Sequence, residues 1–480
     1  MVLQREIPIP VWGTASAGAL VEVTLHHYTV RVKSDPFGAW EVSLPAMKAG
    51  GAYELTITAE KETIQIKDIY IGEVWICSGQ SNMEWALQQS TEGEIEIPKA
   101  NFPLIRLFHL KKKHDTYKTP YSKEQLEAFS KGQFFHQAKW EVCSPETAAL
   151  FSGVGYFFGK TLQDSLNVPI GLIQAAVGGS PAQSWVSKPA LASHPQMRHL
   201  VDSKHDWLNS TIIHPWLAER AKQNWANWEK TKDTPLPGHP FAPNYLFDSA
   251  LNSLAPYALR GAIWYQGESN ATHPSSYPAM MELMLKSWRD LWRQGDFPFY
   301  FVQLPRIGNR NLWPEFRAAQ QQGLSIPNTG MVVTLDQGHP TDVHPRAKKV
   351  VGLRLAHLAL AKTYHKNILA ESPILSSHHW DKTEHKIVLR VKNAFDGLSI
   401  NNGPTPKGIY LQGYLKQGSL EAIIEPDKIQ LTKDEIIIFY SAEFLPVKVK
   451  YAWAAYPENN LINSAGLPLA PFKIDLEGLN

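Results

Sequence analysis

The fold class is best read from residues 74–83. They run Val-Trp-Ile-Cys-Ser-Gly-Gln-Ser-Asn-Met, an apolar stretch that ends in small and polar residues. Several consecutive apolar residues bounded by turn chemistry predict a strand that is buried on both faces, as in a parallel sheet covered by helices. A helix is predicted to follow at 83–89. We therefore expect Ser81 at the carboxyl edge of the sheet, where open α/β sheets bind their ligands.

Three later segments repeat this format, in which an apolar strand runs straight into polar residues. Residues 170–180 include Gly179 near their end, residues 259–270 include Gln266, and residues 331–345 include Asp342 and His344. A hydroxyl nucleophile, a glycine amide, an amide side chain and a histidine thus follow one another, each at a predicted strand end. Parallel strands bring their carboxyl ends to one edge of a sheet, so these groups are predicted to meet.

These segments resemble the SGNH hydrolases, and among them the sialate O-acetylesterases. The resemblance rests on four blocks in order: Gly79-Gln80-Ser81-Asn82-Met83, Gly178-Gly179-Ser180-Pro181, Trp264-Tyr265-Gln266-Gly267-Glu268-Ser269-Asn270 and Asp342-Val343-His344-Pro345. It extends to the opening residues 2–5 and the closing residues 459–472, and so covers nearly the whole chain. The resemblance implies a serine esterase that removes acetyl groups from sugars.

The resemblance also implies roles for the residues of the blocks. Ser81 would attack the acetyl carbonyl, and His344 would take its proton and later pass it to the departing sugar hydroxyl. Asp342 is expected to orient His344. The usual family spacing would put Thr341 in that place. The alternatives to Asp342 are Asp336, at the end of the preceding strand, and a backbone carbonyl near Thr341.

An oxyanion hole is expected from the backbone N–H groups of Ser81 and Gly179 together with one side-chain amide. Family members take that amide from an asparagine in a Gly-x-Asn-Asp turn, a pattern that this chain lacks. Gln266, at the strand end, is favoured for the role, and Asn270 is the alternative. Glu268 is expected to support the turn near Ser81.

The substrate expected first is O-acetylated sialic acid. Its carboxylate calls for an arginine, because a guanidinium pairs with a carboxylate through two hydrogen bonds, and Arg317 is a candidate. Asn82, beside the nucleophile, is grouped with the residues that support the site or contact substrate.

Acetylated plant hemicellulose, such as xylan or xyloglucan, is the alternative substrate. A different kind of function is also considered: a carbohydrate-binding protein with a vestigial esterase site. The 16 tryptophans fit this hypothesis, because aromatic faces offer apolar contact to sugars.

Composition argues against several other functions. The 47 basic and 45 acidic residues nearly balance, which gives no reason to expect nucleic acid or a membrane surface as a partner. Two cysteines, Cys77 and Cys143, are too few for a disulfide framework or a cysteine metal site. The 18 histidines include no zincin-type helical pair, so we expect neither a metal nor another cofactor.

The length of 480 residues suggests about three domains. Residues 1–68 alternate apolar and polar positions and predict an N-terminal β-sandwich. Residues 69–368 alternate strands and helices and predict a parallel sheet layered by helices; the resemblance makes this an SGNH (flavodoxin-like) three-layer αβα hydrolase domain. Residues 369–480 return to alternation and predict a C-terminal β-domain.

Within the hydrolase region, strands are predicted near 73–78, 104–108, 170–177, 260–266, 299–304 and 330–335, with a helical insertion at about 187–241. Pro345 is expected to open a long helix. The sequence contains no transmembrane run and no leader segment. Family members usually follow an export signal, so a periplasmic or secreted location is expected, with the cytoplasm as the alternative.

Overall fold

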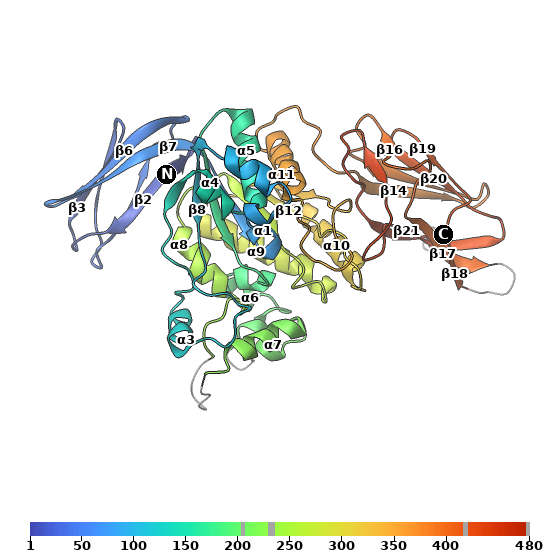
Figure 1. The fold of residues 1–480 in the computed structure, drawn as a ribbon, viewed down its shortest axis with the longest axis horizontal. Helices are drawn as coiled ribbons and strands as arrows, with labels where there is room; N and C mark the ends of the chain where they lie inside the picture. The colour runs from blue at the N-terminus through green and yellow to red at the C-terminus, as the bar shows by residue number, and fades with distance from the viewer. Residues whose placement is uncertain (203–206, 229–235, 416–420, 477–480) are drawn as a thin grey trace. The chain divides into compact units, whose positions relative to one another are not determined.

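The structure is a computed structural model that describes residues 1–202, 207–228, 236–415 and 421–476 (Figure 1). The chain divides into two compact units. The first unit comprises residues 1–269, 279–299 and 346–356, and the second comprises 270–278, 300–345 and 357–480. Among the described residues, no helix has the length and apolar character needed to cross a membrane.

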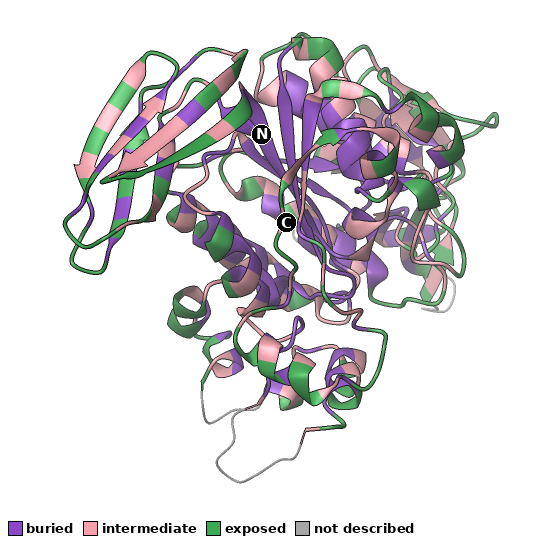
Figure 2. Ribbon diagram, turned by 60° about the vertical axis from the view of Figure 1, so that its left-hand side comes forward, coloured by how far each residue is buried: buried purple, intermediate pink, exposed green. Residues whose placement is uncertain are grey.

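A mixed sheet with a parallel centre forms the core of the first unit. Its central strand β7 (Glu62–Gly79) pairs in parallel with β10 (Ile170–Ala176) and β11 (Gly261–Tyr265). β8 (Phe102–His109) continues the sheet in parallel beyond β10, and β9 (Trp140–Cys143) closes it antiparallel to β8, giving the order β11-β7-β10-β8-β9. Every residue of β10 and β11 is buried (Figure 2), which explains the continuous apolar runs in the sequence.

Helices cover this sheet, so the fold is α/β, as predicted. α5 (Gly153–Leu166) packs closely on β10, because a Cβ built on Gly159 would lie 2.4 Å from Leu172 Cδ1. The helices α3 (Lys123–Ser130), α6 (Lys188–Ser193) and α7 (Pro215–Asn224) lie together below the sheet in the view of Figure 1. The other α-helices that the structure describes before residue 299 are α1 (Ser81–Glu84), α2 (Gly93–Glu96), α4 (Pro145–Ala149), α8 (Asn252–Leu254) and α9 (Tyr277–Trp292).

The single helix predicted at 83–89 is replaced in the structure by a short helix and a 3₁₀ turn. α1 already begins at Ser81, because the Gln80 carbonyl accepts the N–H groups of both Met83 and Glu84. It ends at Glu84, since Trp85 leaves the helical region with ψ 112°. A separate 3₁₀ turn, Leu87–Gln89, follows.

The N-terminal strands share residues with the central sheet. β7 pairs through its first half with β6 (Gly50–Ala59) and through Tyr70–Gly72 with β1 (Val2–Gln4), before it enters the central sheet. β3 (Leu20–Leu25) joins β4 (Tyr28–Lys33) to β6, while β2 (Ile9–Thr14) and β5 (Ala39–Leu44) form a separate antiparallel pair. Burial alternates along β5, as the alternating sequence predicts.

A buried carboxylate ties the N-terminal strands to the central sheet. Glu73 has no exposed surface and accepts hydrogen bonds from Gln4 Nε2 (3.0 Å), Arg5 Nε (2.5 Å) and Arg260 Nε (2.8 Å). All of these donors satisfy the same buried charge, so they fix the N-terminal strands to the central sheet.

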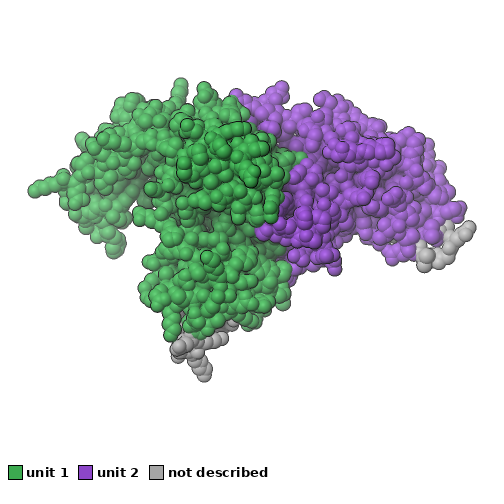
Figure 3. Space-filling model, in the orientation of Figure 1, with its two compact units in different colours: residues 1–269, 279–299, 346–356 green, residues 270–278, 300–345, 357–480 purple. Residues whose placement is uncertain are grey.

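Residues of the second unit are purple in Figure 3. They form two short strands and a helix, followed by the C-terminal antiparallel sheets. β12 (Phe299–Val302) begins at the last residue of a first-unit segment and is followed by α10 (Trp313–Gln322) and β13 (Thr329–Val332). Antiparallel sheets then have the orders β14-β15-β20-β19, β18-β17-β21-β23 and β16-β22. Their strands are β14 (Ile374–Asp381), β15 (Lys386–Lys392), β16 (Leu398–Ile400), β17 (Ile409–Leu415), β18 (Glu421–Ile424), β19 (Lys428–Leu431), β20 (Glu435–Phe439), β21 (Phe444–Tyr451), β22 (Leu461–Asn463) and β23 (Phe472–Asp475).

The long helix α11 (Lys348–Lys362) begins later than predicted. Pro345 does not open it, because the Arg346 carbonyl accepts the Thr91 N–H (3.0 Å) and so holds the chain in a non-helical turn ahead of Lys348.

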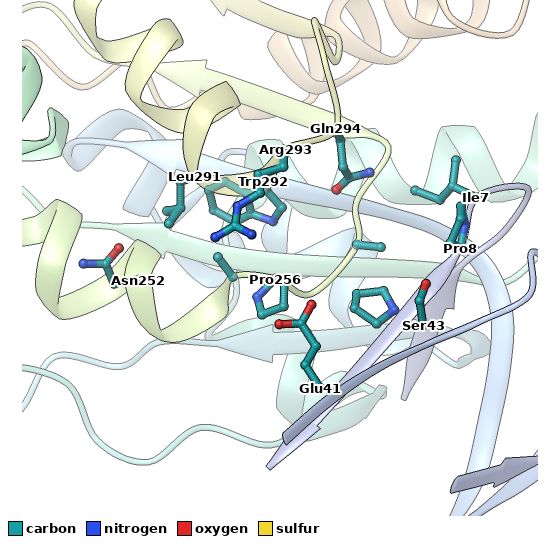
Figure 4. Close-up of a pocket in the computed structure, with 13 residues that line it drawn as sticks. Ile7, Pro8, Glu41, Ser43, Asn252, Pro256, Leu291, Trp292, Arg293 and Gln294 are labelled. Carbon is teal, nitrogen blue, oxygen red and sulfur yellow. The ribbon is translucent and has the colours of Figure 1, made fainter. Parts of the chain in front are cut away.

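A cavity of about 460 Å³ lies where the N-terminal strands meet the end of α9 (Figure 4). Its lining includes Pro10 and Glu41 from the β2–β5 pair and Trp292 and Arg293 from the end of α9. Ala258, just ahead of β11, also lines it, so the cavity lies at the amino end of the parallel strands. It is therefore separate from the strand ends that carry the predicted site.

Candidate active site

Ser81 is the first residue of α1 and lies directly after the central strand. Gly79 makes this sharp turn possible with φ +136°, and a Cβ there would lie 2.1 Å from the Tyr265 carbonyl oxygen. Only glycine fits such a close approach. The Gln80 N–H then donates to the Tyr265 carbonyl (3.0 Å). Ser81 is partly exposed while Asn82 and Met83 are buried, so the serine is the accessible residue of this turn.

Gln80 binds the third block to the nucleophile turn. Its buried side-chain oxygen lies 3.4 Å from the Gly267 N–H nitrogen and 3.3 Å from that of Ser269, and it accepts both hydrogen bonds. No role was predicted for Gln80 from the sequence, where its position at a strand end next to the predicted nucleophile was the one signal.

Glu84, at the end of α1, binds the second block. Its Oε2 accepts the Gly178 N–H (2.7 Å), and its Oε1 pairs with Lys112 Nζ (2.8 Å). Gly178 packs against the nucleophile, since a Cβ built on it would lie 3.6 Å from Ser81 Cβ. Glu84 was not predicted from the sequence either.

Gly179 follows in a left-handed conformation with φ +78°. Its carbonyl accepts the Ser269 hydroxyl (2.9 Å), which joins the second block to the third. The structure therefore brings the blocks around Ser81, Gly179 and Gln266 together within the first unit.

The two amides considered for the oxyanion hole lie in different units. Gln266 is fully buried in the first unit, and its Nε2 lies 3.4 Å from the Ser180 carbonyl oxygen. Asn270 is buried in the second unit, where its carbonyl accepts the His273 N–H (3.0 Å). Gln266 directly follows β11, whereas Asn270 lies four residues further along the chain.

A polar network runs behind the nucleophile. Asn82, which is buried, accepts from Lys348 Nζ through its side-chain oxygen and donates to Glu268 Oε1 through its side-chain nitrogen. Lys348 is 1% exposed, and its ammonium lies 5.5 Å from the Trp85 ring and 5.6 Å from the Tyr265 ring. Burial raises the pKa of Glu268, and the hydrogen bond from Asn82 and the charge of Lys348 oppose that rise.

Lys348 was not expected from the sequence. It stands in a basic stretch after Pro345, where a lysine would ordinarily face water. The supporting role predicted for Glu268 and Asn82 remains a prediction, and the contacts of both residues agree with it.

His344 and Asp342 lie together in the second unit. Asp342 Oδ1 accepts the backbone N–H of His344 (2.9 Å) and lies 3.3 Å from His344 Nδ1. His339 shapes the preceding loop, because its Nδ1 accepts the backbone N–H groups of Thr341 and Asp342 (3.2 Å each). A two-residue spacing therefore suffices for the carboxylate to reach the imidazole.

Asp336, the alternative acid, lies at the protein surface. Asp336 is exposed, and its Oδ2 accepts a hydrogen bond from the neighbouring Gln337 (3.1 Å). The Thr341 hydroxyl lies 3.3 Å from His339 Nδ1. Asp342 contacts the His344 ring, with its Oδ1 3.3 Å from Nδ1.

Arg317 corrects an expectation of the sequence analysis. It has no exposed surface and donates to four backbone carbonyls: Leu304 (2.9 Å), Pro305 (2.7 Å), Ala454 (2.9 Å) and Ala455 (3.0 Å). Burial and the nearby charge of Arg306 lower its pKa to about 9. Its guanidinium joins two loops of the second unit and is not available for a substrate carboxylate.

Known proteins resemble this chain closely enough to identify its family. A family described as carbohydrate esterase, sialic acid-specific acetylesterase, matches residues 71–212 and 226–361, more than half of the chain. The sialate O-acetylesterase of Rattus norvegicus is 28% identical over 429 residues, which cover 78% of this chain and 74% of the relative. The sialate O-acetylesterase of Homo sapiens is 28% identical over 425 residues, covering 78% and 71%.

A solved structure agrees with these relatives. The chain resembles a carbohydrate acetylesterase from Xanthomonas citri with a TM-score of 0.78 and 30% identity, covering 99% of this chain and 97% of that one. These similarities identify an enzyme and not a binding protein alone. The chain belongs to the carbohydrate esterase family of sialic acid-specific acetylesterases and is a carbohydrate O-acetylesterase.

Proposed function

We propose that Ser81 is the nucleophile of this esterase. The observation that carries the proposal is the convergence of the second and third blocks on its turn through Gln80 and Glu84. Ser81 is also the partly exposed residue of a turn whose next two residues are buried. Its hydroxyl would attack the acetyl carbonyl and form an acetyl-enzyme, which water then hydrolyses.

His344 is the general base of the proposal, and Asp342 its orienting acid. The contact of Asp342 with Nδ1 (3.3 Å) would leave Nε2 to take the serine proton. Chain connectivity supports the pairing with Ser81. Lys348 binds Asn82, the residue after Ser81, and His344 stands four residues before Lys348. Four extended residues span at most about 14 Å.

The developing oxyanion would be held by the backbone N–H groups of Ser81 and Gly179 and by the Gln266 amide. Each such donor is worth about 3 kcal/mol in the transition state. Gln266 is favoured over Asn270 because it directly follows β11 and its Nε2 lies 3.4 Å from the carbonyl oxygen of Ser180, in the second block.

The substrate of the proposal is an O-acetylated sialic acid. This rests on the family description and on relatives named sialate O-acetylesterase. One observation favours the alternative, an acetylated neutral hemicellulose: the arginine first considered for the sialic acid carboxylate, Arg317, is occupied by backbone carbonyls.

Acetate release tests the substrate directly. The enzyme would be assayed side by side on 9-O-acetylated sialic acid and on acetylated xylan and xyloglucan oligosaccharides. The proposal predicts a higher kcat/KM on the sialic acid ester. A higher kcat/KM on either hemicellulose oligosaccharide would reject sialic acid and support the alternative.

We infer further that the α/β region is an SGNH-type three-layer hydrolase domain at about 69–368, flanked by β-sandwich-like regions at 1–68 and 369–480. The sheet order β11-β7-β10-β8, with Ser81 after its central strand, supports this. The antiparallel sheets after residue 369 support the C-terminal region.

A further inference from the structure

Two aromatic rings from the segment at 187–241 contact the second block. A Cβ built on Gly179 would lie 2.9 Å from Trp216 Cη2 and 2.9 Å from Phe241 Cζ. The two rings meet edge to face, with centroids 5.5 Å apart. They therefore lie against the residue whose N–H we place in the oxyanion hole.

Phe241 is buried and held from behind. Its N–H donates to His239 Nδ1 (3.0 Å), and His239 Nε2 lies 3.1 Å from Asn224 Oδ1. Burial lowers the pKa of His239 to about 3, so the ring is neutral, and its Nε2–H is the group that donates to Asn224. Asn224 ends α7, the helix that carries Trp216, so the helix and the 239–241 segment form one support.

Trp216 differs from Phe241 because it is partly exposed. Its backbone N–H donates to His214 Nδ1 (3.3 Å), and this hydrogen bond caps α7. The indole touches Gly179, and the neighbouring Gly178 packs against Ser81. An accessible indole thus stands one short turn away from the nucleophile.

The accessible indole suits a sugar better than an acetyl group. Aromatic rings offer a broad apolar surface at low entropic cost, and binding pockets combine such surfaces with a few polar groups. The C–H face of a pyranose is apolar while its hydroxyls point outward, so it can lie on an indole and keep its hydroxyls hydrated.

We propose that Trp216 is a saccharide-binding platform beside the nucleophile, and that it receives the sugar ring which carries the acetyl ester. Phe241 is a positioning residue that holds the Gly179 peptide. This inference rests on the proposed role of Ser81 and adds the residue that selects a saccharide over a small ester.

The test compares the full-length wild type with Trp216→Ala and Trp216→Phe on 4-nitrophenyl acetate, 9-O-acetylated sialic acid and acetylated xylo-oligosaccharide. For the preferred saccharide ester, we expect Trp216→Ala to raise KM about tenfold more than it does for 4-nitrophenyl acetate, the effect of losing one aromatic contact. Trp216→Phe should recover part of the loss. Trp12→Ala, at another exposed tryptophan of the first unit, should change neither KM.

Phe241→Leu should instead lower kcat on all three substrates with little change in KM, because it displaces the oxyanion donor. Equal losses on the nitrophenyl and saccharide esters in Trp216→Ala would mean that Trp216 only supports Gly179, and would overturn the platform. An unchanged KM on both saccharides would overturn it too. Ser81→Ala, assayed in parallel, separates the outcomes, since turnover retained there defeats the nucleophile assignment whatever Trp216 does.

Discussion

At the level of single residues, the short loop before His344 gives Asp342 two contacts with the same histidine, one to its backbone N–H and one to its ring. A carboxylate in this position fixes the imidazole tautomer and stabilises the imidazolium that forms during catalysis. An asparagine would keep the size of the side chain but would lose the charge.

We therefore expect Asp342→Asn to lower kcat by about 10³–10⁴ with an unchanged fold. Asp336→Asn and Thr341→Ala are the matched controls and should stay near the wild-type kcat. A nearly wild-type Asp342→Asn enzyme would show that a backbone carbonyl orients His344. A crippled, folded Asp336→Asn enzyme would move the acid to the strand end.

Lys348 makes a second prediction at this scale, because its buried ammonium is held by Asn82 and by two aromatic faces. Lys348→Met removes a charged hydrogen bond and should lower the free energy of unfolding by about 2 kcal/mol, measured by denaturant titration. Lys349→Met is the control: Lys349 is half-exposed and pairs with Glu96 at 3.4 Å, so its loss should cost less than about 1 kcal/mol. Equal costs for the two variants would contradict the role given to the buried network.

Sequence reasoning can propose residues that carry chemistry, but it does not find the residues that support them. Ser81 and His344 could be selected because nucleophiles and bases are recognisable residue types at strand ends. Gln80 and Glu84 could not, because their roles depend on which backbone N–H lies opposite them. Arg317 was misread, since an arginine in a polar stretch looks the same whether it faces solvent or buried carbonyls.

At the level of elements, α7 and residues 239–241 are joined through a buried, neutral histidine. His239 has a pKa of about 3 in the folded chain and about 6.5 when unfolded. Between these values the unfolded chain binds the extra proton, so stability falls as pH falls from about 6.5 toward 3. The slope from one such group is about 1.4 kcal/mol per pH unit.

The variant His239→Gln removes this titration. We expect its stability to depend less steeply on pH between 6 and 4 than that of the wild type, by about one proton, when thermal midpoints are measured across that range. His109, whose pKa is lowered to about 4, titrates in both proteins and cancels in the difference. Identical slopes in the two proteins would show that His239 titrates normally in the folded state.

Strands were predicted better than helix starts for a physical reason. The predicted strands at 170–177 and 260–266 match β10 and β11 closely, because burial on both faces leaves an apolar run in the sequence itself. The start of α11 depends on a hydrogen bond from Thr91 to Arg346, residues that lie far apart in the sequence. No local pattern records such a bond.

At the level of the whole molecule, the described residues include no group of three or more histidine, cysteine, aspartate or glutamate side chains that could hold a metal ion. The mechanism proposed above also needs none. Activity on 4-nitrophenyl acetate should therefore survive exhaustive chelation with EDTA, measured against an untreated sample. Loss of activity that added zinc or calcium restores would require a metal in the reaction.

The central claim is that this carbohydrate O-acetylesterase works through Ser81, and one measurement tests it most directly. Wild type and Ser81→Ala would be treated with a serine-reactive fluorophosphonate, and the mass of each intact protein would be measured by mass spectrometry. Unlabelled samples of both proteins would be assayed for acetate release. We predict one label on the wild type, none on the variant, and at least a thousandfold lower acetate release by Ser81→Ala with an unchanged melting temperature. Substantial acetate release by the folded variant, or a label that persists on it, would contradict the account.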